Sequence, residues 1–307
     1  LLLNANLDTR AIDLLRTYGS YLWQIYKGAS AETIQLALAS EPWAASQLWN
    51  MFEIRFNPKL ESSIESRVRR FEAAHKTFLD SLRDVPDITK DRILRALADV
   101  MANTTRTNFY QEKDTIALKL LPQQIELMPN PRPLFEIFID SAEMSGVHQR
   151  AAKVARGGIR WSERKEDFRQ EILGLVKTQT TKNALIVPGG AKGGFVLKSA
   201  PSDPKDQMEA VKRAYKTFIR ALLSVTDNRV GANVVSPAEL VVYDDPDPYL
   251  VVAADKGTAT FSDTANAIAT EEFGFWLGDA FASGGSNGYD HKLYGITARG
   301  AWRAVCG

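Results

Sequence analysis

The sequence predicts an α/β domain with a mixed, largely buried sheet, preceded by an α-helical segment. Up to about residue 115, apolar residues recur at helical spacing. After residue 133, short apolar runs alternate with helical stretches. A proline-rich joint at 129–133 separates the two patterns. We therefore place a helical segment over residues 1–128 and an α/β domain over residues 129–307.

Three helices are expected in the first segment. Their apolar stripes run over residues 14–26, 60–82 and 93–101, and Thr89 is expected to cap the third helix at its N-terminus. These stripes should form core, because burying one face is what stabilises a helix in water. No ionisable group in this segment is given a chemical role.

The second segment alternates strands and helices. In chain order, the elements expected are a strand over 135–139, a helix over 168–182, strands over 184–187 and 195–198, a helix over 208–222 and a strand over 249–254. The last of these is a continuous apolar run, which is typical of a strand buried on both faces. The two middle strands flank a glycine-rich loop. Gly300-Ala301-Trp302 indicates the start of a further helix.

Composition excludes several classes of protein. The 307 residues are 45% hydrophobic and 24% charged, as in an ordinary soluble globular protein. The net charge of +1 indicates no nucleic-acid partner, and no apolar run approaches the roughly 18 residues of a membrane-spanning helix. The single cysteine, Cys306, cannot form an internal disulfide, which fits a reducing, cytoplasmic setting. The three histidines lack metal-ligand spacing, so no metal is expected.

The two ends of the chain are abrupt. The first residue is Leu1 rather than methionine, and only five residues follow Trp302. We expect the chain to be part of a longer polypeptide.

Lys192 stands among four glycines, in the segment Pro188-Gly189-Gly190-Ala191-Lys192-Gly193-Gly194. Glycines let the backbone approach a ligand closely, and a lysine in a tight turn between buried strands should lose proton affinity. Such a lysine can polarise a carbonyl or activate water. The alternative is a glycine-rich hairpin with a solvated lysine. A phosphate-binding P-loop matches poorly, because Gly193 stands where a serine or threonine should follow the lysine.

Two further sites pair glycines with charge. Asp255 follows the apolar run at 249–254, where ligand chemistry gathers in open α/β sheets. It can relay protons, or it can simply cap Thr258 or the next helix. Arg156 and Arg160 flank a Gly-Gly pair, a geometry suited to holding a carboxylate, although a surface turn with solvated arginines fits the same pattern.

These glycine-rich segments resemble a known family. The segment at 188–194 is similar to the signature of the glutamate, leucine, phenylalanine and valine dehydrogenases. Longer stretches at 153–162, 247–263 and 282–302 resemble the large bacterial NAD-specific glutamate dehydrogenases in particular. The resemblance covers roughly residues 130–305. It implies that L-glutamate, NAD and water give 2-oxoglutarate, ammonia and NADH, in a cytoplasmic enzyme that is a homo-oligomer at full length.

The resemblance also implies roles for individual residues. Lys192 matches the catalytic lysine that activates water, and Asp255 matches the aspartate that carries protons to and from the amino group. Lys182 matches the lysine that holds the α-carboxylate. Arg156 stands where small glutamate dehydrogenases have a lysine for the side-chain carboxylate, which keeps the charge but changes the geometry. By the same resemblance, Gly189 and Gly190 belong to the substrate-binding loop.

A dinucleotide-binding domain is expected to be absent from this chain. No Gly-x-Gly-x-x-Gly segment occurs anywhere in it, and in the family the NAD domain follows the segment at 297–302. We therefore expect the isolated polypeptide not to oxidise glutamate. Two alternatives remain open: a noncatalytic regulatory or assembly domain of the same fold, and a dehydrogenase acting on another amino acid.

Overall fold

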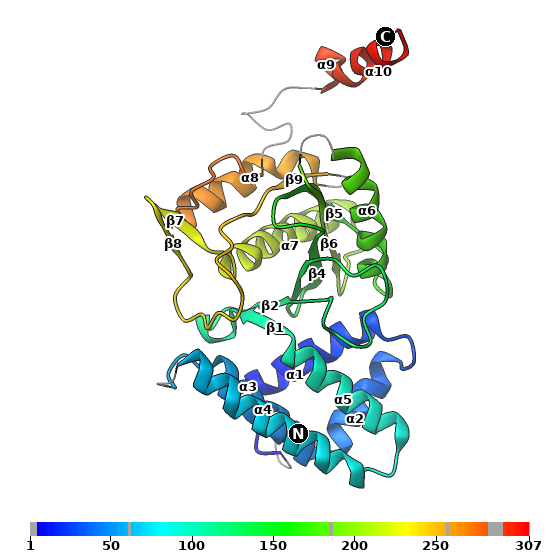
Figure 1. The fold of residues 1–307 in the computed structure, drawn as a ribbon. Helices are drawn as coiled ribbons and strands as arrows, with labels where there is room; N and C mark the ends of the chain where they lie inside the picture. The colour runs from blue at the N-terminus through cyan, green and yellow to red at the C-terminus, as the bar shows by residue number, and fades with distance from the viewer. Residues whose placement is uncertain (1–4, 61–62, 184–186, 256–257, 282–290, 307) are drawn as a thin grey trace.

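The computed structural model describes residues 5–60, 63–183, 187–255, 258–281 and 291–306 (Figure 1). Within these ranges, no helix is both long enough and apolar enough to span a membrane. The chain forms a helical segment followed by a mixed sheet with helices packed on it, which confirms the predicted fold class.

The helical segment holds five α-helices, gathered at one end of the sheet in Figure 1. They are α1 (Thr9–Ile25), α2 (Ala31–Ser40), α3 (Pro42–Phe56), α4 (Ile64–Ser81) and α5 (Ile88–Ala102). The three predicted helices are confirmed as α1, α4 and α5. The cap predicted at Thr89 is wrong, because the Asp87 carboxylate accepts from the backbone N–H groups of Thr89 and Lys90. A carboxylate there also interacts favourably with the helix dipole.

Strands begin earlier than the sequence pattern predicts. β1 (Thr104–Thr107) and β2 (Ile116–Leu120) lie within the segment expected to be helical, and they pair with the main sheet. Their burial is continuous rather than alternating, since every residue of both strands is buried. Polar residues such as Arg106 and Lys119 therefore face inward and obscure the strand pattern. The division into two domains at residue 129 stays a prediction.

The sheet has seven strands in the order β1-β2-β3-β4-β6-β5-β9. The remaining members are β3 (Phe135–Asp140), β4 (Met144–Arg150), β5 (Ala155–Trp161), β6 (Gly189–Leu197) and β9 (Val252–Ala254). Neighbours from β1 to β6 are antiparallel, whereas β5 runs parallel to both β6 and β9. A separate hairpin joins β7 (Asn228–Val230) to β8 (Asn233–Val235).

Helices cover both faces of this sheet. On one face, Phe138 and Val196 pack with the helical segment and with α6 (Phe168–Asn183). On the other, Ile137 and Phe195 pack with α7 (Pro204–Ser224). We call these the α6 face and the α7 face. Consecutive residues of a strand point to opposite faces of a sheet, so Ile137 and Phe138 belong to different hydrophobic cores. The α6 face and the α7 face therefore each have a core of their own.

The glycine-rich segment lies inside a strand. β6 runs continuously through Gly189–Leu197 and pairs with β4 and β5 along its length, so the predicted loop and hairpin at 188–194 are wrong. Glycine is compatible with extended backbone as well as with turns. The strand expected over 184–187 falls largely outside the described residues.

Shorter elements complete the chain. They are the 3₁₀ turns at Leu82–Asp84, Phe109–Gln111 and Ala259–Phe261, α8 (Ser262–Ala267), the π-helical turn η4 (Ile268–Glu272), α9 (His291–Tyr294) and α10 (Ile296–Cys306). The strand predicted over 249–254 is confirmed only for its last three residues, which form β9.

Candidate functional site

Lys192 and Asp255 meet on the α6 face of the sheet. Lys192 lies in the middle of β6, and Asp255 directly follows β9. The Lys192 ammonium contacts a carboxylate oxygen of Asp255. The lysine side chain is 6% exposed, whereas the aspartate side chain is 46% exposed. The pair is therefore a buried cation beside a carboxylate that solvent or a ligand can reach.

Gly158 is the reason that this contact can form. It lies in β5, between the strands that carry the two charged residues, and it is in register with Lys192 on one side and with Ala253 on the other. A Cβ atom at Gly158 would lie 2.8 Å from the Cβ of Asp255. The lysine thus reaches across a strand position that has no side chain.

Gly189 and Gly190 are explained by close packing of backbone. A Cβ at Gly190 would lie 2.5 Å from the backbone nitrogen of Thr180, and the Gly190 N–H donates to the Thr180 hydroxyl at 3.0 Å. A Cβ at Gly189 would lie 2.7 Å from that of Ala152. Gly190 therefore allows the C-terminal turn of α6 to lie directly on the sheet beside Lys192. A substrate contact by either glycine stays a prediction.

The two predicted anchors differ in what the structure describes. Arg156 lies near the start of β5, in register with Gly190, so it shares the α6 face with Lys192. Its side chain is exposed. Lys182 lies in the last turn of α6, two residues after Thr180, but its side chain is outside the described part of the structure. The structure thus brings Lys192, Asp255 and Arg156 to one face and leaves the Lys182 side chain unplaced.

Arg160 has a partner within the protein. Its guanidinium lies 2.7 Å from the Glu171 carboxylate of α6, and the Ser162 hydroxyl donates to the same carboxylate. A pair of carboxylate-binding arginines around Gly157 and Gly158 is therefore not what the structure contains. Arg160 joins β5 to α6, and of the two arginines only Arg156 remains as a candidate anchor.

The α7 face carries a second cluster of charge that is almost wholly buried. Three cations from β1, β2 and β4 alternate with three carboxylates, and the pairs are Arg106 with Asp227 and Asp244, Lys119 with Asp244 and Asp247, and Arg150 with Asp247. We call these six residues the buried charge network. Desolvation opposes ionisation of Asp247, but Arg150 and Lys119 outweigh it and hold its pKa below the usual value.

This network holds the segment that leads into β9. Arg150 also donates to the carbonyl oxygens of Lys153 at 3.0 Å and Tyr249 at 2.9 Å. It therefore links the end of β4 to the start of β5 and to the stretch before β9. Asp255 follows that stretch along the chain, so the network anchors the segment that leads to the candidate site.

His148 is a buried neutral histidine beside the network. It lies on β4 in register with Gly193, and its Nε2 has no hydrogen-bond partner among the described residues. Burial, and then the positive charge of Arg150, lowers the pKa of His148 to about 3. The ring is therefore uncharged near neutral pH.

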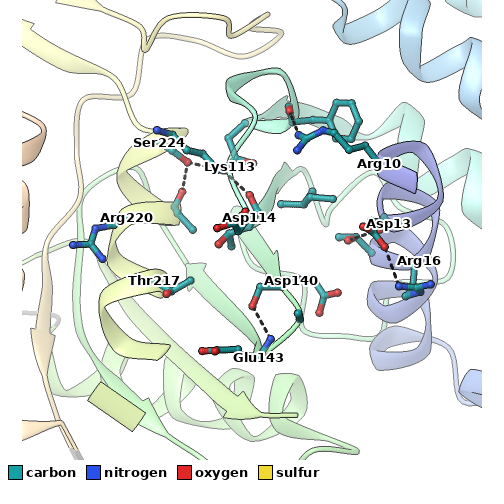
Figure 2. Close-up of a pocket in the computed structure, with 18 of the residues that line it drawn as sticks. Arg10, Asp13, Arg16, Lys113, Asp114, Asp140, Glu143, Thr217, Arg220 and Ser224 are labelled. Carbon is teal, nitrogen blue, oxygen red and sulfur yellow. Dashed lines mark hydrogen bonds and ion pairs between the residues drawn. The ribbon is translucent and has the colours of Figure 1, made fainter. Parts of the chain in front are cut away.

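A large cleft lies elsewhere among the described residues. It has a volume of about 930 Å³ and opens between α1, α7 and the turn that joins β3 to β4 (Figure 2). Figure 2 shows Arg10 and Arg16 on one wall and Arg220 on the other, with acidic residues between them. Several of these charges are paired, as in Lys198 with Asp140 at 2.9 Å. The cleft shares no lining residue with the Lys192 and Asp255 pair.

Sequence patterns missed three residues that shape the site. Gly158 was recognised only as part of a cationic glycine cluster, and nothing marked Gln149 or Arg150. Gln149 lies directly opposite Lys192 in the β4 and β6 ladder. Its position depends on strand register between distant segments, which no local pattern reveals.

Comparison with known proteins points to one family. Residues 77–306 match the family model described as bacterial NAD-glutamate dehydrogenase, catalytic domain, and residues 1–58 match glutamate dehydrogenase, helical motif 3. The chain is 52% identical to the NAD-specific glutamate dehydrogenase of Halomonas elongata, 50% to that of Pseudomonas aeruginosa and 48% to that of Mycobacterium tuberculosis. Each alignment covers 99% of this chain and 19–20% of the relative. The chain therefore spans about a fifth of the length of these relatives.

Proposed function

Because the chain belongs to the family of the bacterial NAD-glutamate dehydrogenase catalytic domain, we propose that it carries the substrate half-site of such an enzyme. The reaction would be oxidative deamination of L-glutamate with NAD and water, giving 2-oxoglutarate, ammonia and NADH. One observation carries the proposal: a buried lysine contacts a half-exposed aspartate across Gly158, on a face that also presents Arg156.

The unequal exposure of Lys192 and Asp255 supports different roles for the two residues. Lys192 is fixed and buried, so its ammonium can stabilise negative charge that develops on a substrate oxygen or on an attacking water. Asp255 is accessible, so it can leave the lysine, accept a proton from the substrate amino group and return it to departing ammonia. Imine formation and hydrolysis need such an acid and base pair.

Two cations would hold the two carboxylates of glutamate. We assign the side-chain carboxylate to Arg156, since a guanidinium binds a carboxylate through two parallel hydrogen bonds. We assign the α-carboxylate to Lys182, at the end of the helix that lies against Gly190. Two cations at these positions would select a dicarboxylate over an amino acid with an apolar side chain. The segment at 188–194 also supports membership of the wider glutamate, leucine, phenylalanine and valine dehydrogenase superfamily.

NAD has no evident site among the described residues. The glycine-rich segment is buried within β6, so it is not a phosphate-binding turn at the start of a helix. We propose that residues outside those of this chain bind most of the cofactor, which agrees with the chain's share of its relatives' length. We also propose a homo-oligomeric full-length enzyme in the cytoplasm, in line with the resemblance and the single cysteine.

Titration of 2-oxoglutarate against this chain by calorimetry tests the half-site. We expect wild-type binding to weaken at least tenfold in Lys192→Ala, with an unchanged melting temperature. Identical binding in both proteins would favour a noncatalytic domain of the same fold. The matching test of specificity is Arg156→Leu in a full-length enzyme carrying this sequence. An unchanged preference for glutamate there would remove Arg156 from the pocket.

A further inference from the structure

Gln149 lies directly opposite Lys192 in the antiparallel pair of β4 and β6. Directly opposite residues in such a pair point to the same face, with Cβ atoms about 5 Å apart. Gln149 is fully buried, and its side-chain oxygen has no hydrogen-bond partner among the described residues. A buried carboxamide oxygen without a donor therefore lies beside the candidate catalytic lysine.

The orientation of this carboxamide is determined by its other neighbour. The Gln149 side-chain nitrogen donates to the Glu136 carboxylate at 3.2 Å. Glu136 in turn accepts two hydrogen bonds of 2.7 Å from Arg169, and neither of those side chains is exposed. An ionised carboxylate only accepts hydrogen bonds, so the nitrogen of Gln149 must face it. The oxygen is consequently left on the side of the carboxamide away from Glu136.

A buried acceptor with no donor costs free energy, and a donor that reaches it in another state of the protein is one explanation for its presence. Lys192 lies between two acceptors, Asp255 across Gly158 on one side and Gln149 on the neighbouring strand on the other. The more exposed member of the ion pair is Asp255, so it is the aspartate that is free to turn toward a ligand.

We propose that Gln149 is a positioning residue, whose oxygen accepts a hydrogen bond from the Lys192 ammonium when Asp255 turns to the substrate. The exchange keeps the lysine charged and in place while the aspartate accepts and returns a proton. No proton leaves the lysine in this step, and no bond other than hydrogen bonds changes. The inference rests on the proposed function, because it assumes that Asp255 acts on the substrate.

The test uses the full-length dehydrogenase that carries this sequence, with Gln149→Met as the principal variant. The methionine side chain is similar in length to that of glutamine, but its sulfur is only a weak hydrogen-bond acceptor. The matched control is Gln24→Met on α1, where a buried glutamine contacts the far side of the same polar cluster through the Arg169 backbone. We expect Gln149→Met to lower kcat about 30-fold while KM for glutamate stays within about twofold. The limb of the pH profile set by the lysine should move to lower pH, because its charged form loses an acceptor.

Equal losses of kcat and of melting temperature in Gln149→Met and Gln24→Met would show a purely structural role and would overturn the inference. Should Gln149→Met fail to fold, Gln149→Asn withdraws the oxygen by one methylene, and wild-type kcat in that variant would overturn it as well. Lys192→Ala separates the two levels. Full turnover in Lys192→Ala would contradict the proposed function itself. An inactive Lys192→Ala together with a fully active Gln149→Met would contradict only the role of Gln149.

Discussion

The buried charge network on the α7 face and the Lys192 and Asp255 pair on the α6 face differ in how far solvent can reach them. On the α7 face, Arg106, Lys119 and Arg150 are each paired with carboxylates, and all six members of the buried charge network are at most 12% exposed. On the α6 face, a lysine that is almost as buried faces an aspartate that is 46% exposed.

This difference separates charge that holds the fold from charge that can react. Movement of any member of the buried charge network is unfavourable, since the displaced group would lose its partner in a region closed to solvent. An ion pair with one accessible member can exchange that partner for a ligand. The comparison predicts that changes in the buried charge network affect stability first and that changes in the Lys192 and Asp255 pair affect turnover first.

The largest effect should come from replacing one buried lysine on each face. In a full-length enzyme carrying this sequence, Lys192→Met should lower kcat about a thousandfold, within the range expected for loss of an acid or base catalyst. Its melting temperature should change little, because Asp255 can turn to solvent. Lys119→Met should instead lower the melting temperature, since it leaves two carboxylates buried beside an apolar side chain. Steady-state kinetics with thermal unfolding of both variants would check this, and the opposite assignment would break the comparison.

Asp247→Asn should destabilise the chain by about 3 kcal/mol at pH 7, because Arg150 and Lys119 would lose a buried counter-charge. The pKa of Asp247 is lowered in the fold. Its contribution is therefore present above the unfolded value near pH 4 and disappears as the pH falls through the folded value. Urea unfolding should show the variant and the wild type converging at low pH.

The control for this substitution is Asp245→Asn, two residues away, where the side chain is exposed and pairs with exposed Lys153. Little change is expected there. Equal destabilisation by both substitutions would show that the network is not special.

His148 sharpens the comparison through pH. Its pKa of about 3 in the fold lies below the unfolded value near 6.5. Its contribution to stability is complete above pH 6.5 and is lost progressively as the pH falls toward 3. Between pH 6.5 and 5, this amounts to about 2 kcal/mol. His148→Leu should remove that decline in urea unfolding, whereas His75→Gln, at a half-buried position, should remove less. A decline that persists unchanged in His148→Leu would contradict the assignment.

The smallest expected effect concerns the gap in β5. Gly158→Ala would bring a Cβ to 2.8 Å from that of Asp255, so the aspartate must shift. We expect kcat to fall about tenfold, as for a displaced acid or base catalyst, with a small change in stability. Gly174→Ala in α6 is the control, because a Cβ there meets nothing within 4 Å and alanine favours the helix. Kinetics that do not distinguish the two variants would remove Gly158 from the site.

The sequence predicted α1, α4 and α5 because the information for these helices is local. The stripes of α1, α4 and α5 repeat within a few turns, and burial of one face fixes the outcome. The glycines around Lys192 and the strand end before Asp255 also marked these two residues as candidates, whereas their shared site was implied only by the resemblance to the dehydrogenases. The residues that determine each of these features lie within a short stretch of the chain.

What failed depends on distant partners. The segment at 189–194 was expected to turn, but glycines suit close strand packing equally, and only the presence of Thr180 and Ala152 against it decides between the two. β1 and β2 were missed because Arg106 and Lys119 are buried by carboxylates more than a hundred residues later. Gln149 gained its place opposite Lys192 from register alone.

The central claim is that Lys192, Asp255, Arg156 and Lys182 face one pocket that holds a five-carbon diacid. A crystal structure of this chain with 2-oxoglutarate tests it most directly. The account predicts one carboxylate on Arg156, the other on Lys182, and the keto oxygen within hydrogen-bonding distance of the Lys192 ammonium. A diacid bound in the cleft between α1 and α7, or bound on the α6 face with its keto group turned away from Lys192, would contradict it.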